Sequence, residues 1–208
     1  MKSALMEFIG TLFLVLVIGL TVIAPGAGPL APLAIGAMLM VMVYAGGHVS
    51  GAHYNPAVTV AVWLRGKCPA KDVPVYIAAQ MAGAVVAALL VGWLKRGSPV
   101  DVARPEALPA FLAESLFTFA LSFVVLSVAT SKKTAGNSYF GLAIGGTVMA
   151  AAYAAGHISG GAFNPAVAVG LTIMGLSAAS HLWIFLLGNF AGGALAAVAF
   201  RATHPEES

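Results

Sequence analysis

Two short segments of this chain share a residue pattern that suits the start of a helix. Each begins with Asn-Pro-Ala after a His-x-Ser-Gly sequence, and the two asparagines lie 109 positions apart (164 minus 55). The repeated residues are Asn55, Pro56, Ala57, Asn164, Pro165 and Ala166. Asparagine caps a helix while its amide can still donate a hydrogen bond, and proline suits the first turn because no backbone N–H is needed there. Because the N-terminal end of a helix is positive, two such ends facing each other would repel a cation and spare a neutral solute.

The composition of the chain indicates a membrane protein. Of its 208 residues, 60% are hydrophobic and 8% are charged, whereas about 25% are charged in a soluble domain. The apolar residues form blocks, such as 6–23 and 111–129, of roughly the twenty residues that cross a hydrocarbon core. Because backbone amides must be paired in hydrocarbon and the alternating pattern of a membrane barrel is absent, the spans are predicted to be helices. The expected fold class is an all-α membrane protein.

Some apolar segments are long enough to cross a membrane and two are too short. The long segments are predicted at about 4–23, 32–47, 73–94, 108–130, 138–156 and 180–201. The short ones, at about 55–64 and 164–174, begin at the Asn-Pro pairs and are predicted to be half-helices. The first span is interrupted by Glu7 and lacks a small-residue cleavage site, so we expect a permanent helix and no cleaved signal peptide.

The chain is predicted to be one domain, 1–208, made of two repeats at about 1–95 and 108–202 that are joined by a linker at about 95–107. Three spans and one half-helix per repeat force the repeats into opposite orientations, so the half-helices should meet near the middle of the membrane, around a pore. Most Lys and Arg residues fall on the predicted side that carries both termini, which favours cytoplasmic termini in a multi-pass protein of the plasma (inner) membrane. The basic residues are dispersed, so no nucleic-acid partner is expected.

The doubled Asn-Pro-Ala motif resembles that of the aquaporin (major intrinsic protein) family, and the resemblance extends from Ala4 to about Phe200. It implies a right-handed bundle of six transmembrane helices plus two re-entrant half-helices, with a pore for water and small neutral solutes in each protomer. It also implies a homotetramer in the lipid bilayer and no cofactor. By the same resemblance, Asn55 and Asn164 donate hydrogen bonds to the passing solute, and backbone carbonyls of the loops 47–54 and 156–163 accept them.

Two acids and two histidines recur at matching places in the repeats. Glu7 and Glu114 lie in predicted spans, where an acid is by default a candidate for a proton relay. In the family the matching glutamates accept hydrogen bonds from backbone amides of the re-entrant loops, so loop support is the favoured interpretation. His48 and His157 are grouped with these acids as loop support, and they are expected to be buried structural residues or to line the pore. Neither pair requires a metal, and none is expected.

The resemblance also locates a selectivity filter of four residues, counted from the motifs. They are Ile35, Ala152, Gly161 and Val167. The last position is nearly always arginine in water channels and glycerol facilitators, and the facilitators place an aspartate where this chain has Ala168. Because arginine supplies charge and bulk, valine predicts a wider and apolar constriction. The pair Phe185 and Leu186 resembles nodulin-like and related bacterial channels, some of which lack the filter arginine and are associated with arsenic resistance.

These observations favour a passive channel for metalloid hydroxides such as arsenite, together with water and glycerol. A general water and small-polyol channel is the main alternative, and a filter that is packed shut is another. An ion-coupled secondary transporter also uses inverted repeats and broken helices, but it commonly needs a titratable residue in its pathway. An enzyme is disfavoured, because the Ser/His pair at His157 and Ser159 recurs at His48 and Ser50 as part of the repeat.

Overall fold

Residues 1–207, which the computed structural model describes, form a bundle of six long and two short α-helices. The long helices are α1 (Lys2–Val22), α2 (Ala31–Ser50), α4 (Val73–Leu94), α5 (Ala107–Ala129), α6 (Phe140–Ser159) and α8 (Leu182–Thr203). The short helices are α3 (Pro56–Leu64) and α7 (Pro165–Ile173). Single turns of 3-10 helix lie at η1 (Gly28–Leu30), η2 (Lys132–Thr134), η3 (Ala179–His181) and η4 (Pro205–Glu207). The predicted all-α fold class is confirmed.

The long helices have the length and composition of membrane spans. The shortest contains 20 residues and the longest 23, which corresponds to roughly 30 Å at about 1.5 Å per residue. Within residues 1–207, six helices are apolar enough to cross a bilayer. Large apolar side chains such as Leu89, Leu116 and Val198 are exposed on the bundle, as expected where lipid replaces water. The chain is therefore an integral membrane protein.

The ends of α2 and α6 differ from the sequence prediction. The helices continue beyond the expected ends at 47 and 156, and they stop where Gly51 and Gly160 adopt left-handed backbone angles (φ 85° and 97°). Glycine ends a helix in this way because it has no Cβ to clash. The prediction of loops at 47–54 and 156–163 was therefore wrong for 47–50 and 156–159, which are helical. The non-helical segments that lead into α3 and α7 are 51–55 and 160–164.

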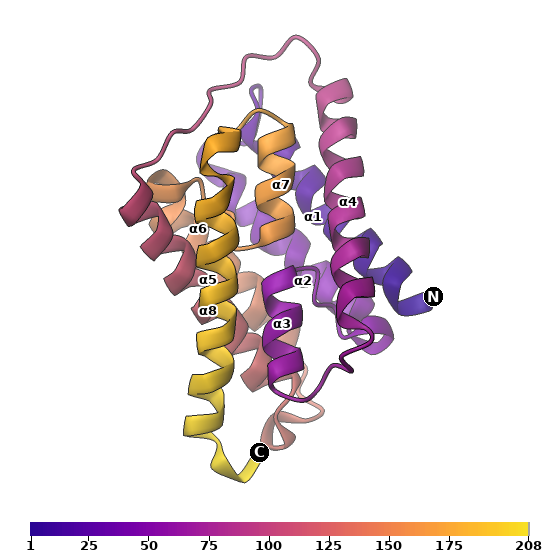
Figure 1. Cartoon of the computed structure of the whole chain (residues 1–208). Helices are drawn as coiled ribbons and strands as arrows, with labels where there is room; N and C mark the ends of the chain where they lie inside the picture. The colour runs from indigo at the N-terminus through magenta and orange to yellow at the C-terminus, as the bar shows by residue number, and fades with distance from the viewer. Residues whose placement is uncertain (208) are drawn as a thin grey trace.

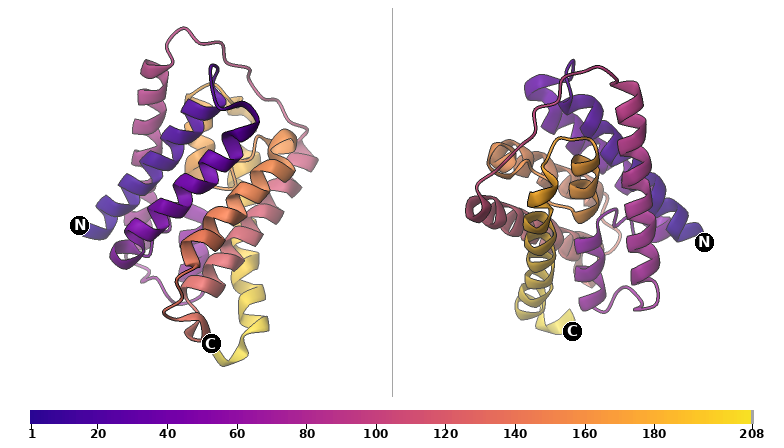
Figure 2. Two further views of the ribbon diagram at one scale, coloured as in Figure 1. Left: turned by 180° about the vertical axis from the view of Figure 1, so that it is seen from behind. Right: turned by 45° about the horizontal axis from the view of Figure 1, so that its top comes forward.

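The helices pair in the same way in both halves of the chain. In the first half α1 packs along α4, and in the second α5 packs along α8, while α2 and α6 contact each other between the halves. Figure 1 shows α3 and α7 one above the other, beside α4 and α8, and Figure 2 shows the same bundle from behind and tilted. The linker between α4 and α5 crosses one end of the bundle, and the C-terminus lies at the other (Figure 1).

At the C-terminal end of the bundle, a buried ion pair fixes the turn η4. The Arg65 Nη2 and Glu207 Oε2 atoms lie 2.9 Å apart, and the two side chains are 5% and 2% exposed. The other carboxylate oxygen of Glu207 accepts hydrogen bonds from the Ser131 hydroxyl (2.8 Å) and the Lys132 N–H (2.7 Å). The guanidinium of Arg65 also lies 4.9 Å from the centroid of the Phe200 ring. These contacts connect η4 to the end of α3, to α8 and to the turn after α5.

Candidate functional site

The two Asn-Pro-Ala segments form the first turns of the half-helices. Asn55 and Asn164 are the N-cap residues of α3 and α7, and Pro56 and Pro165 are the first helical residues. In both helices the asparagine Oδ1 accepts hydrogen bonds from the second and third helical N–H groups, at 2.9 and 3.4 Å. Each asparagine therefore satisfies N–H groups that a helix start leaves unpaired.

Each capping asparagine also forms a bridge to the other half of the chain. The Nδ2 group of Asn55 donates to the carbonyl of Phe163 (2.9 Å), and that of Asn164 donates to the carbonyl of Tyr54 (2.8 Å). The positive ends of the half-helices are thus joined by two matching hydrogen bonds. Because an Nδ2 group carries two N–H bonds, each asparagine keeps one for another acceptor. Sequence reasoning missed this bridge, since its partners lie 108 and 110 positions apart.

The segments before the half-helices have strained backbone conformations. Tyr54 and Phe163 have φ angles of 49° and 48°, in the left-handed region that bulky residues rarely adopt. The Tyr54 ring is accommodated by two glycines, because a Cβ at Gly10 or Gly46 would collide with it. The Tyr54 hydroxyl donates to the carbonyl of Met42 (3.0 Å). Packing and hydrogen bonding therefore offset a strain of about 1 to 3 kcal/mol per residue.

Glu7 of α1 is fully buried and holds the first of these segments. Its Oε1 accepts hydrogen bonds from the Ser50 hydroxyl (2.6 Å) and the His53 N–H (3.0 Å). Its Oε2 accepts from the Tyr54 N–H (2.7 Å) and from Nε2 of Gln80 (2.7 Å). Charge-assisted bonds of this kind offset the cost of burying a carboxylate, so the same contacts keep the acid buried and hold the loop.

Glu114 of α5 has the equivalent position in the second half and is also fully buried. Its carboxylate accepts hydrogen bonds from the Ser159 hydroxyl (2.7 Å) and from the N–H groups of Ala162 (2.9 Å) and Phe163 (2.6 Å). Neither Glu7 nor Glu114 is among the residues that line the cavity described next. The geometry therefore places both acids beside the solute path as loop supports and does not favour a proton relay along it.

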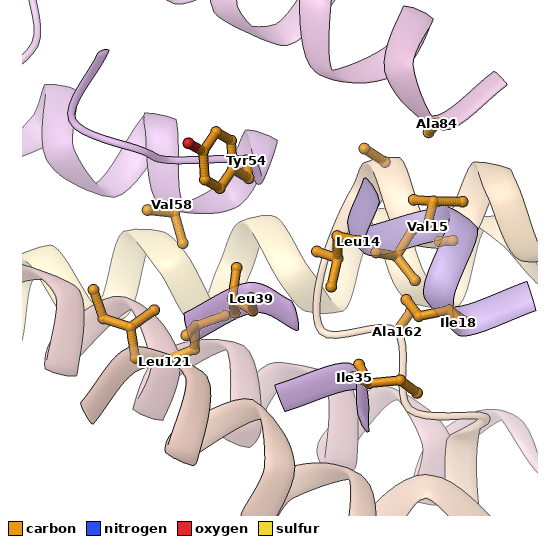
Figure 3. Close-up of a cluster of buried hydrophobic side chains, with 14 of the residues drawn as sticks. Leu14, Val15, Ile18, Ile35, Leu39, Tyr54, Val58, Ala84, Leu121 and Ala162 are labelled. Atoms are coloured by element: carbon orange, nitrogen blue, oxygen red, sulfur yellow. The ribbon is translucent and has the colours of Figure 1, made fainter. Parts of the chain in front are cut away.

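A cavity of about 360 Å³ extends from the junction of the half-helices to the linker between α4 and α5. The four predicted filter positions all line it: Ile35, Ala152, Gly161 and Val167. Asn55 and Asn164 border its inner end. Figure 3 shows Leu14, Ile18 and Ile35 pointing toward the same space. Apart from Asp101 at the outer end, no Asp, Glu, Lys or Arg is found among the described residues that line the cavity.

The structure corrects the expectation for the two repeated histidines. His48 and His157 are exposed on the last turns of α2 and α6 and do not line the cavity, so the prediction of buried or pore-lining residues was wrong. The buried positions of α2 in this region are Gly46 and Ser50. Because His48 is two residues from each, it lies about 200° around the helix from them and faces outward.

A different histidine, His53, borders the cavity. Its Nδ1 lies 3.1 Å from the Thr59 hydroxyl oxygen, and its ring packs against Tyr76 with the centroids 5.2 Å apart. His53 also lines a second hollow, which it shares with residues at the end of α5, so it lies between the cavity and that hollow. Sequence reasoning missed His53 because it looked for repeated residues, and the matching position in the second half is Ala162.

A bundle of six spans in which two capped half-helices meet beside a cavity is the architecture of an aquaporin-like channel. The family model described as "Major intrinsic protein" matches residues 1–200. The chain therefore belongs to the major intrinsic protein family.

Two similar proteins and one solved structure agree with this assignment. "Aquaporin NIP1-4" of Oryza sativa subsp. japonica is 38% identical over 209 residues, which cover 96% of this chain and 76% of that protein. "Glycerol uptake facilitator protein-like 6" of Lactiplantibacillus plantarum is 36% identical over 217 residues, which cover 100% of both chains. The X-ray structure of the aquaglyceroporin from Plasmodium falciparum has the same fold, with a TM-score of 0.79 at 21% identity over 99% of this chain and 98% of that one.

Membership of the family defines the class of function. The chain is an aquaporin- or aquaglyceroporin-type channel for water and small solutes. Channels of this family conduct passively and are not enzymes. The hydroxyl of Ser159 donates to Glu114, so the serine of the Ser/His pair considered from the sequence supports the loop, and His157 is exposed beside it.

Proposed function

We propose that this channel conducts metalloid hydroxides such as protonated arsenite, along with water and glycerol. The observation that carries the proposal is the cavity lining at Ile35, Ala152, Gly161 and Val167, which contains no charge, histidine or aromatic ring. A protonated metalloid hydroxide is neutral at neutral pH and wider than water. A constriction without arginine is wider and lacks a fixed charge that would hold water in place.

We call the four residues Ile35, Ala152, Gly161 and Val167 the apolar ring. Polar groups next to it supply the hydrogen bonds that a dehydrated hydroxide needs. The remaining N–H groups of Asn55 and Asn164 act as donors, and the backbone carbonyls of the segments 51–55 and 160–164 act as acceptors. Gly160 and Gly161 border the cavity, where the absence of a side chain lets a solute approach the backbone. Two helix N-termini meet at the same point and oppose the passage of cations.

General conduction of water and small polyols is the second candidate. A relative named as a glycerol uptake facilitator covers the whole chain at 36% identity, which supports glycerol as a solute. The two candidates differ in which solute passes fastest. Ion-coupled transport differs from both, because its flux needs a proton or sodium gradient.

We further propose one channel domain, 1–208, with inverted repeats at about 1–95 and 108–202. It would assemble as a homotetramer in the plasma (inner) membrane with both termini in the cytoplasm. Arg65 and Lys132 contact the C-terminal turn through Glu207, so basic residues gather at the end of the bundle that carries the C-terminus. An excess of Lys and Arg in short loops marks the cytoplasmic side.

Swelling of reconstituted vesicles tests the proposed function. Purified protein in liposomes should speed the entry of arsenite, glycerol and water above the rate of protein-free liposomes, with no energy source and no ion gradient. Urea provides a neutral solute of comparable size without hydroxyl groups. Protein that conducts water and excludes both arsenite and glycerol would contradict the proposal, and a flux that requires a sodium or proton gradient would contradict the channel mechanism.

A further inference from the structure

The outer end of the cavity contains two polar side chains that the conduction mechanism has not used. Asp101 of the linker and Ser177 of the turn after α7 both line the cavity beyond the predicted filter. Their neighbours in this lining are apolar, among them Val22, Pro32 and Leu176. A solute that enters from this side therefore meets two polar groups before it reaches the apolar ring.

Backbone hydrogen bonds hold the linker against the turn that carries Ser177. The Ala103 N–H donates to the carbonyl of Leu176 (2.9 Å), and the Ala178 N–H donates to the carbonyl of Ala103 (3.4 Å). Ala103 and Ser177 consequently form an isolated β-bridge. Asp101 is two residues from Ala103, so their Cα atoms are at most about 7 Å apart. The linker thus keeps Asp101 and Ser177 at the same mouth of the cavity.

The hydroxyl of Ser177 lacks a hydrogen-bond partner in the described chain. The residue is 4% exposed, and its Oγ has no donor or acceptor within residues 1–207. Buried polar groups are nearly always paired, because an unpaired one costs free energy. Rotation of the Ser177 side chain about its Cα–Cβ bond would bring this covered hydroxyl to a solute in the cavity, which can supply the missing bond.

The carboxylate of Asp101 is exposed and forms no ion pair in the described part of the chain. Lys95, at the start of the same linker, donates instead to the carbonyls of Ile23 and Pro25. The carboxylate oxygens are therefore available to accept hydrogen bonds from a solute. A carboxylate accepts and does not donate, so it favours solutes that present O–H groups and disfavours anions.

We propose that Asp101 and Ser177 form a capture site for neutral solutes with several hydroxyl groups. This inference rests on the proposed function, because it concerns solutes on their way through the same constriction. A solute must lose part of its hydration shell to enter the apolar ring, and the two side chains replace some of the water that it loses. Binding at such a site is weak, since a channel solute must also leave.

Reconstituted variants test the capture site by the ratio of two permeabilities. The solutes are glycerol and 1,2-propanediol, which has one hydroxyl fewer at similar size, and water flux reports correct folding. Asp101→Ala should lower glycerol permeability by about threefold to tenfold, the effect of one hydrogen bond, with a smaller loss for propanediol and little change for water. Ser177→Ala should act in the same direction, and Asp101→Asn, which keeps one acceptor oxygen, should recover part of the ratio.

Glu106→Ala is the matched control, because Glu106 is an exposed acid of the same region that does not line the cavity. It should leave the glycerol to propanediol ratio unchanged. If Asp101→Ala lowers the permeability to glycerol, propanediol and water equally, Asp101 supports the fold of the linker, and the capture site is overturned. If the wild type conducts glycerol and Asp101→Ala leaves the glycerol to propanediol ratio unchanged, the capture site alone would be overturned. Wild-type protein that conducts water but no hydroxylated solute would overturn the proposed function as well.

Discussion

The two halves of the molecule share a backbone plan but differ in the side chains around it. In the first half, Gln80 donates to the Thr59 hydroxyl (3.0 Å) and the His53 ring lies 3.1 Å from the same oxygen. In the second half, the positions that match His53 and Thr59 are Ala162 and Ala168. The first half therefore has a polar cluster beside its half-helix, and the second has small apolar side chains there.

The amides that correspond to each other are also used differently. Gln80 donates to Glu7, whereas the matching Asn189 accepts a hydrogen bond from Thr118 (2.8 Å). The repeat thus preserves the support of the strained backbone and leaves the surrounding side chains free to diverge. The second half contributes Ala152, Gly161 and Val167 to the cavity, so the half with the smaller side chains supplies three of the four predicted filter residues.

The largest effect is expected at Val167, which the second half contributes to the predicted filter. Val167→Arg adds charge and bulk to the apolar ring, so permeability to arsenite and glycerol should fall about tenfold or more, which corresponds to about 1.4 kcal/mol in the barrier. Water permeability should fall much less, and stopped-flow swelling gives the ratio. Val167→Leu is the control that adds bulk without charge. An unchanged ratio in Val167→Arg would place the narrowest point elsewhere, for instance at His53 in the first half.

The junction of the half-helices is where the two halves should behave alike. Asn55→Asp and Asn164→Asp keep the cap but remove the Nδ2 donor and add a negative charge at the positive helix ends. Each variant should raise cation conductance about fivefold, from roughly 1 kcal/mol of lost helix-end repulsion, as measured by current across planar bilayers. Appreciable current in the wild type, or an increase in one variant only, would show that the two ends are not equivalent barriers.

The buried acids should differ in the stability that their hydrogen bonds provide. Glu114→Gln places an amide against N–H donors and should cost about 2 kcal/mol in the free energy of unfolding. Glu7→Gln should cost about 1 kcal/mol, because the Gln80 amide can turn its free Oε1 toward the new donor. Thermal unfolding in detergent measures both, and adding Gln80→Leu to Glu7→Gln should remove the difference. Folded variants that lose a proton-dependent flux would instead indicate a relay.

The smallest effect on conduction is expected at η4, which does not line the cavity and has no counterpart in the first half. The Ser131 hydroxyl and the N–H groups of Lys132 and Lys133 lower the pKa of Glu207, although burial acts in the other direction. The pKa of Glu207 is therefore lower in the folded state than in the unfolded state. The ionised Glu207 carboxylate stabilises the fold above the unfolded pKa, about 4.3, and this stabilisation is lost as pH falls through the folded pKa. Glu207→Gln should therefore lower the unfolding temperature at neutral pH and have little effect in acid. Glu206→Gln, at the exposed pair with Lys133, is the control, and an equal shift in both variants would contradict the prediction.

Features that depend on local pattern were predictable from the sequence. Spans of apolar residues fix the six long helices, and Asn-Pro fixes the starts of α3 and α7 at Pro56 and Pro165. The positions counted from the motifs, such as Ile35 and Val167, do line one cavity. The helices follow from the length of an apolar segment or from a cap that is visible within that segment, whereas the filter positions follow from the resemblance to the family.

Features that depend on contacts between distant segments were not predictable. The helix pattern alone did not decide between Gly47 and Gly51 as the end of α2, because either glycine can end a helix. The outward orientation of His48 depends on which face of α2 packs inward. Glu207 of η4 contacts Arg65, which lies more than a hundred positions earlier in the chain. No periodicity in the sequence connects two residues so far apart.

The bridge between the half-helices also bears on how the chain is made. Asn55 finds its partner carbonyl at Phe163, 108 residues later in the chain. At a synthesis rate of about 5 to 20 residues per second, that partner appears about 5 to 20 seconds after Asn55. Until then, the Asn55 Nδ2 group and the Tyr54 carbonyl lack their partners in the second half, and unpaired polar groups are unfavourable in hydrocarbon. We therefore expect α3 to reach its final depth, and the first half its final structure, only after the ribosome has passed α7.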